Sequence, residues 1–210
     1  YVFQRTPSSV DLRGNSPTDP EWAETLKPGW QRERRENFND ILLGVPVEED
    51  LVNDGWTEIF RDLMSVVPAN KEKDPEITPE EAAEMAEIAD FKKMNGIRQR
   101  VDDTVKNEEV ADLLKPWYRQ FCKRPTFNDE FLPTFNRENV TLVDTSINKG
   151  IDRITEKGIV ANGIEYELDC IIFATGFEVG TVYTRRAGFE VTGQDGKTLS
   201  EHFAGGLKTF

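Results

Sequence analysis

The pattern of apolar and polar positions at the start of the chain predicts a strand followed by a loop. Residues 1–5 combine aromatic and β-branched side chains, and residues 6–9 are Thr-Pro-Ser-Ser. The loop continues through Gly14 and Pro17. We therefore expect a short strand that ends near Arg5.

A helical pattern replaces the strand pattern from Asp19 onward. Asp19-Pro20-Glu21 supplies a capping residue, a first-turn proline and an early acid, and Pro28-Gly29 interrupts this helix soon after it begins. Apolar residues then recur at helical spacing in residues 31–43 and again in residues 51–63.

A second helix start stands at Thr78-Pro79-Glu80-Glu81. The Thr78 hydroxyl and the Glu81 carboxylate can each accept a hydrogen bond from the other residue's free backbone N–H, which is a capping box. We expect helices from here to about Leu114, with a break near Asn95-Gly96. Residues 19–115 as a whole therefore predict a helical block.

Short strands return after residue 140. Four segments rich in β-branched residues are separated by Asn, Gly and charged turns, namely residues 140–143, 151–154, 158–160 and 164–168. The run Cys170-Ile-Ile-Phe-Ala174 is continuously apolar, which is typical of a strand buried on both faces of a sheet. A strand, a long helical block and further strands indicate an α/β fold in which helices are inserted into a nucleotide-binding domain.

Composition and charge narrow the function. The chain of 210 residues has 39 acidic and 26 basic residues and a formal net charge of -13, which disfavours nucleic-acid partners. We find no apolar run long enough to span a membrane and no signal-peptide layout, so a cytoplasmic protein is the expectation. Two separated cysteines and one histidine exclude a Cys/His zinc site, and they disfavour a Ser-His-Asp hydrolase.

The first candidate site is Arg5-Thr6, at the end of the predicted first strand. In a doubly wound sheet the carboxyl end of the second strand faces the adenosine ribose, where cationic and hydroxyl groups accept a 2'-phosphate. A guanidinium beside a hydroxyl matches phosphate oxygens well. An arginine that ends an exposed strand can equally be only solvated, so this alternative stays open.

The second candidate is Arg119-Gln-Phe-Cys-Lys123-Arg124-Pro125, which concentrates three cations in an acidic chain. Pro125 is expected to end a helix and to leave Lys123 and Arg124 on an irregular exit, where side chains can reach a crevice. The alternative is that these cations only complement the dipole of a helix C-terminus.

The third candidate is Ala174-Thr175-Gly176, where the apolar run of residues 170–174 stops. Glycine has no Cβ, so a dinucleotide could approach the backbone closely there. A tight turn that leaves a sheet explains the same residues.

Taken together, these motifs resemble the type I Baeyer–Villiger flavin monooxygenases. The resemblance rests, in order, on Tyr-Val-Phe-Gln-Arg-Thr-Pro-Ser from Tyr1, Cys-Lys-Arg-Pro from Cys122, Phe-Asn-Arg-Glu-Asn-Val-Thr-Leu-Val-Asp from Phe135 and Ile-Ile-Phe-Ala-Thr-Gly-Phe-Glu from Ile171. Ala-Thr-Gly-Phe also occurs in related flavin monooxygenases, and the Lys-Arg pair behind a helical insertion is the more diagnostic element.

The resemblance implies an internal fragment of an enzyme that uses FAD, NADPH and O2 to convert a ketone into an ester or lactone through a C4a-peroxyflavin. It places Arg5, Thr6 and Lys123 at the NADPH 2'-phosphate, Arg124 beside the flavin as a catalytic residue, and Ala174, Thr175 and Gly176 at a cofactor. It also divides a Rossmann-like NADPH-binding domain (1–18 and 119–176) around a helical insertion (19–118), and residues 177–210 begin the return to the FAD-binding domain.

Some features of the family cannot be checked in this sequence. Its Gly-rich dinucleotide fingerprints and an active-site acid would lie before Tyr1, so the 210 residues alone are expected to be inactive. The ketone and the oligomeric state are not predicted. A nitrogen- or sulfur-oxygenating flavin monooxygenase is the alternative enzyme, and a helical interaction module is the alternative outside enzymes.

Overall fold

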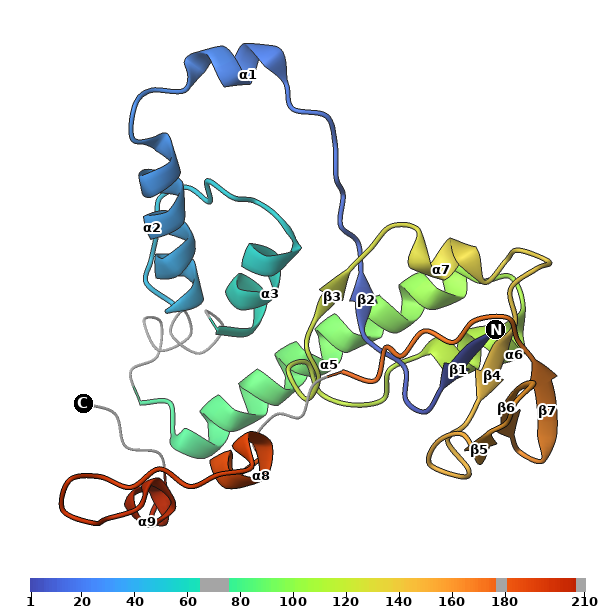
Figure 1. The fold of residues 1–210 in the computed structure, drawn as a ribbon. Coiled ribbons are helices and arrows are strands. Elements are labelled where there is room, and N and C mark those ends of the chain that lie inside the picture. The colour runs from blue at the N-terminus through green and yellow to red at the C-terminus, as the bar shows by residue number, and fades with distance from the viewer. Residues whose placement is uncertain (65–75, 177–180, 207–210) are drawn as a thin grey trace. The chain divides into compact units, whose positions relative to one another are not determined.

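The chain folds into two units in a computed structural model that describes residues 1–64, 76–176 and 181–206 (Figure 1). The first unit is Tyr1–Glu167 and the second is Leu168–Phe210. In the described part of the chain, no helix is both long and apolar enough to cross a membrane.

The predicted strand at the start of the chain pairs with the strand predicted after residue 140. β1 (Val2–Gln4) runs parallel to β4 (Leu142–Asp144), with Phe3 opposite Val143 (Figure 1). The Thr145 amide extends the pairing by donating to the Gln4 carbonyl over 2.8 Å. Because parallel neighbours cannot be joined by a tight turn, a long crossover must connect them, and it contains the helical block.

A second parallel pair joins two segments that showed no strand pattern. β2 (Val10–Asp11) pairs with β3 (Thr126–Phe127). The Thr126 amide and hydroxyl both donate to the carbonyl of buried Ser9, over 3.2 and 2.7 Å. The chain that follows Arg5 therefore lies beside the chain that follows Arg124.

The first three helices confirm the predicted helical pattern. α1 (Pro20–Thr25) is capped by the Asp19 side chain, and α2 (Trp30–Leu42) begins after Gly29, whose φ of 97° suits glycine. α3 (Gly55–Met64) packs against α2.

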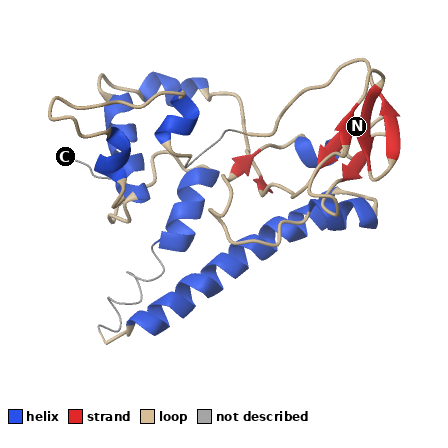
Figure 2. Cartoon of the chain, turned by 60° about the horizontal axis from the view of Figure 1, so that its bottom comes forward, coloured by secondary structure: helices blue, strands red, loops and turns tan. Residues whose placement is uncertain are grey.

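The longest helix is α5 (Pro79–Thr104), which has 26 residues and the capping box predicted at Thr78. The predicted break near Asn95-Gly96 is wrong, because α5 runs through it without interruption (Figure 2). A helical glycine costs at most about 1 kcal/mol relative to alanine. The neighbouring Met94 and Ile97 are buried, and each such side chain gains roughly 1.5–3 kcal/mol from burial, so packing outweighs the glycine.

The next helix, α6 (Glu108–Leu114), ends where the helical block was predicted to end, at Leu114. The separate expectation of a helix that Pro125 ends is wrong, because residues 115–125 form no helix. Pro116 disfavours helical backbone at Lys115, which has φ −75° and ψ 121° and is the C-cap. The cations that follow are therefore not at a helix end, and the interpretation of Lys123 and Arg124 as dipole partners is wrong.

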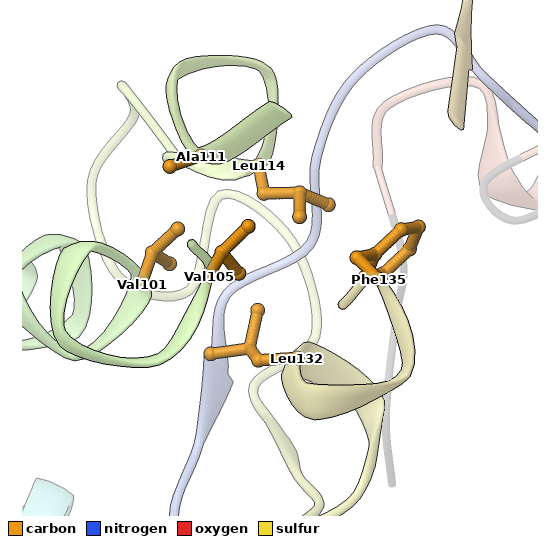
Figure 3. Packing of buried hydrophobic residues seen from close by; sticks show 6 residues of the cluster. All are labelled: Val101, Val105, Ala111, Leu114, Leu132 and Phe135. Carbon is orange, nitrogen blue, oxygen red and sulfur yellow. The ribbon is translucent and has the colours of Figure 1, made fainter. Parts of the chain in front are cut away.

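A hydrophobic cluster fixes the ends of α5 and α6 against the short helix α7 (Phe131–Thr134). Figure 3 shows its six buried residues converging from these three helices and their ends: Val101, Val105, Ala111, Leu114, Leu132 and Phe135. Leu142 of β4 packs against the cluster, so the core reaches the parallel strand pair.

The remaining strands of the first unit were predicted as short strands, and the structure pairs them in an antiparallel meander. β5 (Arg153–Ile154), β6 (Gly158–Ala161) and β7 (Ile164–Glu167) pair in that order. Asn162 and Gly163 connect β6 to β7 with φ of 52° and 77°, the two positive values that a tight two-residue hairpin needs.

The second unit contains α8 (Tyr183–Ala187) and α9 (Leu199–Phe203). The predicted buried strand at residues 170–174 is wrong: residues 170–176 have no regular structure, and Ile172 and Phe173 are 87% and 68% exposed. A strand of this composition needs hydrogen-bonded neighbours and a layer on each face. The described residues of the second unit provide neither.

Candidate functional site

The end of β1 is held firmly where it presents Arg5 and Thr6. The Gln4 carbonyl accepts from the Thr145 amide, and the Gln4 side chain donates to the Leu113 carbonyl in the last turn of α6 over 2.9 Å. Arg5 and Thr6 come directly after this anchor, and both are exposed. Their side chains are therefore accessible to a ligand although their backbone is fixed.

Lys123 lies beside these two residues in the structure. Its Nζ donates a 3.1 Å hydrogen bond to the Thr6 carbonyl, across 117 residues of sequence. Its ammonium also stands 5.6 Å from the centre of the Tyr118 ring. The structure thus brings together residues from two separate candidate sites, and we call Arg5, Thr6 and Lys123 the cationic clamp.

The clamp carries positive charge that the described residues do not balance. Burial lowers the pKa of Lys123, and the neighbouring charge of Arg5 lowers that pKa further. In residues 1–64, 76–176 and 181–206, no carboxylate lies within ion-pair distance of Arg5 or Lys123. Two neighbouring cations without an acid between them are suited to bind an anion.

Arg124 follows the clamp and is exposed. It stands between Lys123 and buried Pro125, directly before β3 begins at Thr126. Within the described part of the chain, no ion pair or hydrogen bond occupies its guanidinium. It is a fixed-charge donor that remains accessible to a ligand.

Ala174, Thr175 and Gly176 belong to the second unit, whereas the cationic clamp belongs to the first. All three are exposed. Gly176 has a φ of 83°, in the left-handed region that other residues rarely adopt. Glycine adopts this conformation without strain because it has no Cβ.

Sequence reasoning missed the contacts that hold the segment before Lys123. Arg98 of α5 donates to the Pro116 carbonyl over 2.8 Å and stacks 4.4 Å above the Trp117 ring. Two further residues of α5 contact the same segment. Glu87 forms an ion pair with Arg119, and the Asp90 side chain accepts a hydrogen bond from the backbone N–H of Gln120. No sequence pattern could have found these contacts, because each depends on how two distant segments pack.

The curated proteins that the chain resembles are monooxygenases and related biosynthetic enzymes. No family model matches the chain. The chain is 53% identical over 210 residues to Baeyer-Villiger monooxygenase ATR8 of Stachybotrys chlorohalonatus, and 50% identical over 212 residues to neopentalenolactone D synthase of Streptomyces avermitilis. The matches cover the whole chain but 33% and 35% of these proteins, so the chain spans about a third of the length of its curated relatives.

Solved structures agree with these relatives. The chain matches the polycyclic ketone monooxygenase of the fungus Thermothelomyces thermophila with a TM-score of 0.76 and 39% identity, over 97% of this chain and 34% of that one. A steroid monooxygenase bound to NADP matches with a TM-score of 0.66 and 26% identity, over 99% of this chain and 39% of that one. The predicted resemblance is confirmed: the chain is homologous to part of the Baeyer–Villiger monooxygenases.

The name of one further relative includes the cofactor FAD. The FAD-binding monooxygenase hmp7 of Hypomyces subiculosus is 44% identical over 209 residues, which is 100% of this chain and 34% of that protein.

Proposed function

We propose that this chain is the part of an FAD- and NADPH-dependent monooxygenase that holds the NADPH 2'-phosphate and supplies an arginine to the flavin site. The whole enzyme would use O2 to convert a ketone into an ester or lactone. The observation that carries the proposal is the contact of Lys123 with Thr6 beside Arg5, since it assembles an anion site at the end of a parallel strand.

The residues of the cationic clamp fit a 2'-phosphate. Arg5 would offer a planar pair of N–H donors, Thr6 its hydroxyl and Lys123 an ammonium 5.6 Å from the centre of the Tyr118 ring. A phosphate dianion would neutralise the two cations and relieve their mutual repulsion, which lowers the pKa of Lys123 in addition to the larger effect of burial. NADH lacks this phosphate, so the clamp would select NADPH.

The parallel pair of β1 and β4 supports a Rossmann-like arrangement in which residues 1–18 and 119–176 form parts of one NADPH-binding domain. Residues 19–118 would be the helical insertion, and residues 177–210 would begin the return to the FAD-binding domain. The exposed backbone around Gly176, with Ala174 and Thr175 before it, would then lie against a cofactor.

Arg124 is proposed as the catalytic residue. When bound, the flavin supplies the oxygen chemistry. Arg124 would hold a permanent positive charge where negative oxygen develops, and its guanidinium keeps its proton at any working pH, so it would not quench a nucleophilic oxygen by protonating it. Its side chain is exposed and has no ion-pair partner among the described residues, which supports this role.

The proposal is tested with a protein of the relatives' full length that contains this chain. We expect a yellow protein with stoichiometric FAD, NADPH oxidation that a cyclic ketone accelerates, and lactone that carries one oxygen atom from labelled O2. Flavin reduction by NADPH without any ester or lactone from a panel of linear, cyclic and polycyclic ketones would contradict the assignment.

A further inference from the structure

Tyr118 contacts both segments that form the cationic clamp, and the motifs do not include it. It belongs to the irregular segment after α6. Its hydroxyl donates a 2.9 Å hydrogen bond to the carbonyl of Pro7, which is 111 residues away in sequence and directly follows Thr6. One side chain thereby ties the segment before Lys123 to the segment that carries Arg5 and Thr6.

The ring of Tyr118 contacts the other half of the clamp. The Lys123 ammonium stands 5.6 Å from the ring centre, within the range of a cation–π interaction, and from there it reaches the Thr6 carbonyl. A lysine has a flexible four-carbon stem, so an ammonium without such a support samples many positions. The Tyr118 ring and the Thr6 carbonyl together give the ammonium two contacts that favour its position beside Thr6.

The electrostatics of Tyr118 suit a structural hydrogen-bond donor. Burial raises the pKa of its phenol, and hydrogen bonds from the Ser9 backbone and side chain act in the opposite direction. The hydroxyl therefore keeps its proton near neutral pH and continues to donate to Pro7. The segment before it is fixed independently, since Arg98 of α5 donates to the Pro116 carbonyl and stacks on Trp117.

We infer that Tyr118 is a positioning residue that sets the distance between the two halves of the cationic clamp and thereby specifies NADPH over NADH. The inference rests on the proposed function, because it assigns Tyr118 to the same 2'-phosphate. Tyr118 acts through Lys123 and the Pro7 backbone and does not itself touch the phosphate.

Two variants separate the contributions of Tyr118. Tyr118→Phe keeps the ring under Lys123 and removes the hydrogen bond to Pro7, whereas Tyr118→Leu removes both. The matched control is Tyr166→Phe in β7, a hydroxyl deletion on a tyrosine whose ring packs against Tyr1 and Phe3.

The measurement is the binding of adenosine 2',5'-bisphosphate and of adenosine 5'-monophosphate to the full-length protein by calorimetry. For Tyr118→Phe we expect the bisphosphate affinity to fall by about threefold to tenfold, as for one lost neutral hydrogen bond, with the monophosphate affinity unchanged. Tyr118→Leu should lose about a further twofold to fivefold with the cation–π contact. The ratio of kcat/KM for NADPH to that for NADH should fall in parallel, and Tyr166→Phe should leave all three quantities unchanged.

The outcomes distinguish this inference from the proposed function. If the unmodified protein binds the bisphosphate no more tightly than the monophosphate, the 2'-phosphate clamp itself is wrong. If the unmodified protein prefers the bisphosphate, but Tyr118→Phe weakens both nucleotides equally or neither of them, the clamp stands and the role of Tyr118 is overturned. Tyr118→Phe alone tests the role of Tyr118, even if Tyr118→Leu fails to fold.

Discussion

Asp90, in the middle of α5, accepts a 2.8 Å hydrogen bond from the backbone N–H of Gln120. Both residues are buried, with 8% and 5% of their surface exposed. Gln120 precedes Lys123 by three positions, and an ion pair between Glu87 and Arg119 contacts the same segment one helical turn earlier along α5. The helical block and the segment that carries the candidate site are therefore joined by a buried carboxylate.

Replacing Asp90 with alanine should loosen the segment before Lys123. The Gln120 N–H would lose its hydrogen-bond acceptor inside the protein, which costs about 1–3 kcal/mol. We expect a lower Tm of the full-length protein and faster hydrogen exchange at the Gln120 amide. Glu84→Ala, at an exposed position of the same helix, is the control and should change neither measurement. Unchanged exchange at Gln120 in Asp90→Ala would show that the hydrogen bond does not hold the segment.

Removing the Lys123 ammonium should weaken NADPH binding selectively. A charge-assisted contact to phosphate is worth roughly 1.5–3 kcal/mol, and NADH has no 2'-phosphate to lose. We expect Lys123→Ala to lower kcat/KM for NADPH much more than for NADH in steady-state assays of the full-length enzyme. Lys92→Ala, an exposed lysine of α5, serves as the control. Equal losses for the two cofactors would move Lys123 away from the phosphate.

The lowered pKa of Lys123 predicts a pH dependence of phosphate binding. A lysine is charged below its pKa and neutral above it, so the attraction is complete at lower pH and is lost as the pH rises through the pKa. Burial and the charge of Arg5 lower that pKa, so the affinity for adenosine 2',5'-bisphosphate should fall at a less alkaline pH than the titration of an ordinary lysine. The measurement covers the range above about pH 7, where the phosphate is fully ionised.

Two variants test the cause of this alkaline loss. Arg5→Gln removes the second cation, so the pH of half-maximal binding should move upward although binding itself is weaker. Lys123→Arg keeps its charge throughout and should abolish the loss at alkaline pH. An identical midpoint in Arg5→Gln and the parent would mean that Arg5 does not influence Lys123.

Arg124→Ala should separate flavin reduction from oxygenation. Hydride transfer depends mainly on how NADPH lies, whereas oxygenation needs a positive charge near developing negative oxygen. We expect NADPH to reduce the flavin at close to the parental rate in stopped-flow measurements, with hydrogen peroxide formed in place of lactone. Loss of one such contact typically costs about 10²–10³ in rate. Arg124→Lys should restore activity only in part, and lactone formation by Arg124→Ala at the parental rate would remove Arg124 from the mechanism.

Two glycine substitutions should have opposite effects on stability. A Cβ added to Gly55 at the start of α3 would lie 2.6 Å from Cδ1 of Phe127 in β3, so Gly55→Ala must displace the ring and should cost about 1–3 kcal/mol. A Cβ at Gly96 in α5 would meet nothing within 4 Å, so Gly96→Ala should add about 0.5–1 kcal/mol. Thermal unfolding of both variants checks the pair, and a Gly55→Ala protein as stable as the parent would show that Phe127 can move freely.

The sequence by itself determined the elements whose causes are local. Caps at Asp19 and Thr78 mark helix starts, and β-branched runs mark the strands, because these signals act within a few residues. The motif pairs Arg5-Thr6 and Lys123-Arg124 were also evident, since each is contiguous. Local patterns failed where packing or a partner strand determines the secondary structure. Packing carries α5 through Gly96, and residues 170–174 form no strand because they lack a hydrogen-bonded neighbour among the described residues.

Only the tertiary structure decided which of these pieces meet. Lys123 reaches Thr6 because the two-residue strands β2 and β3 run side by side, and strands that short are too brief to show any periodicity. Tyr118 and Asp90 carry no signal in the sequence, because what they do depends on backbone atoms 111 and 30 residues away. Hydrophobic spacing reports how one segment folds, whereas a contact across the chain exists only after the core has brought the two segments together.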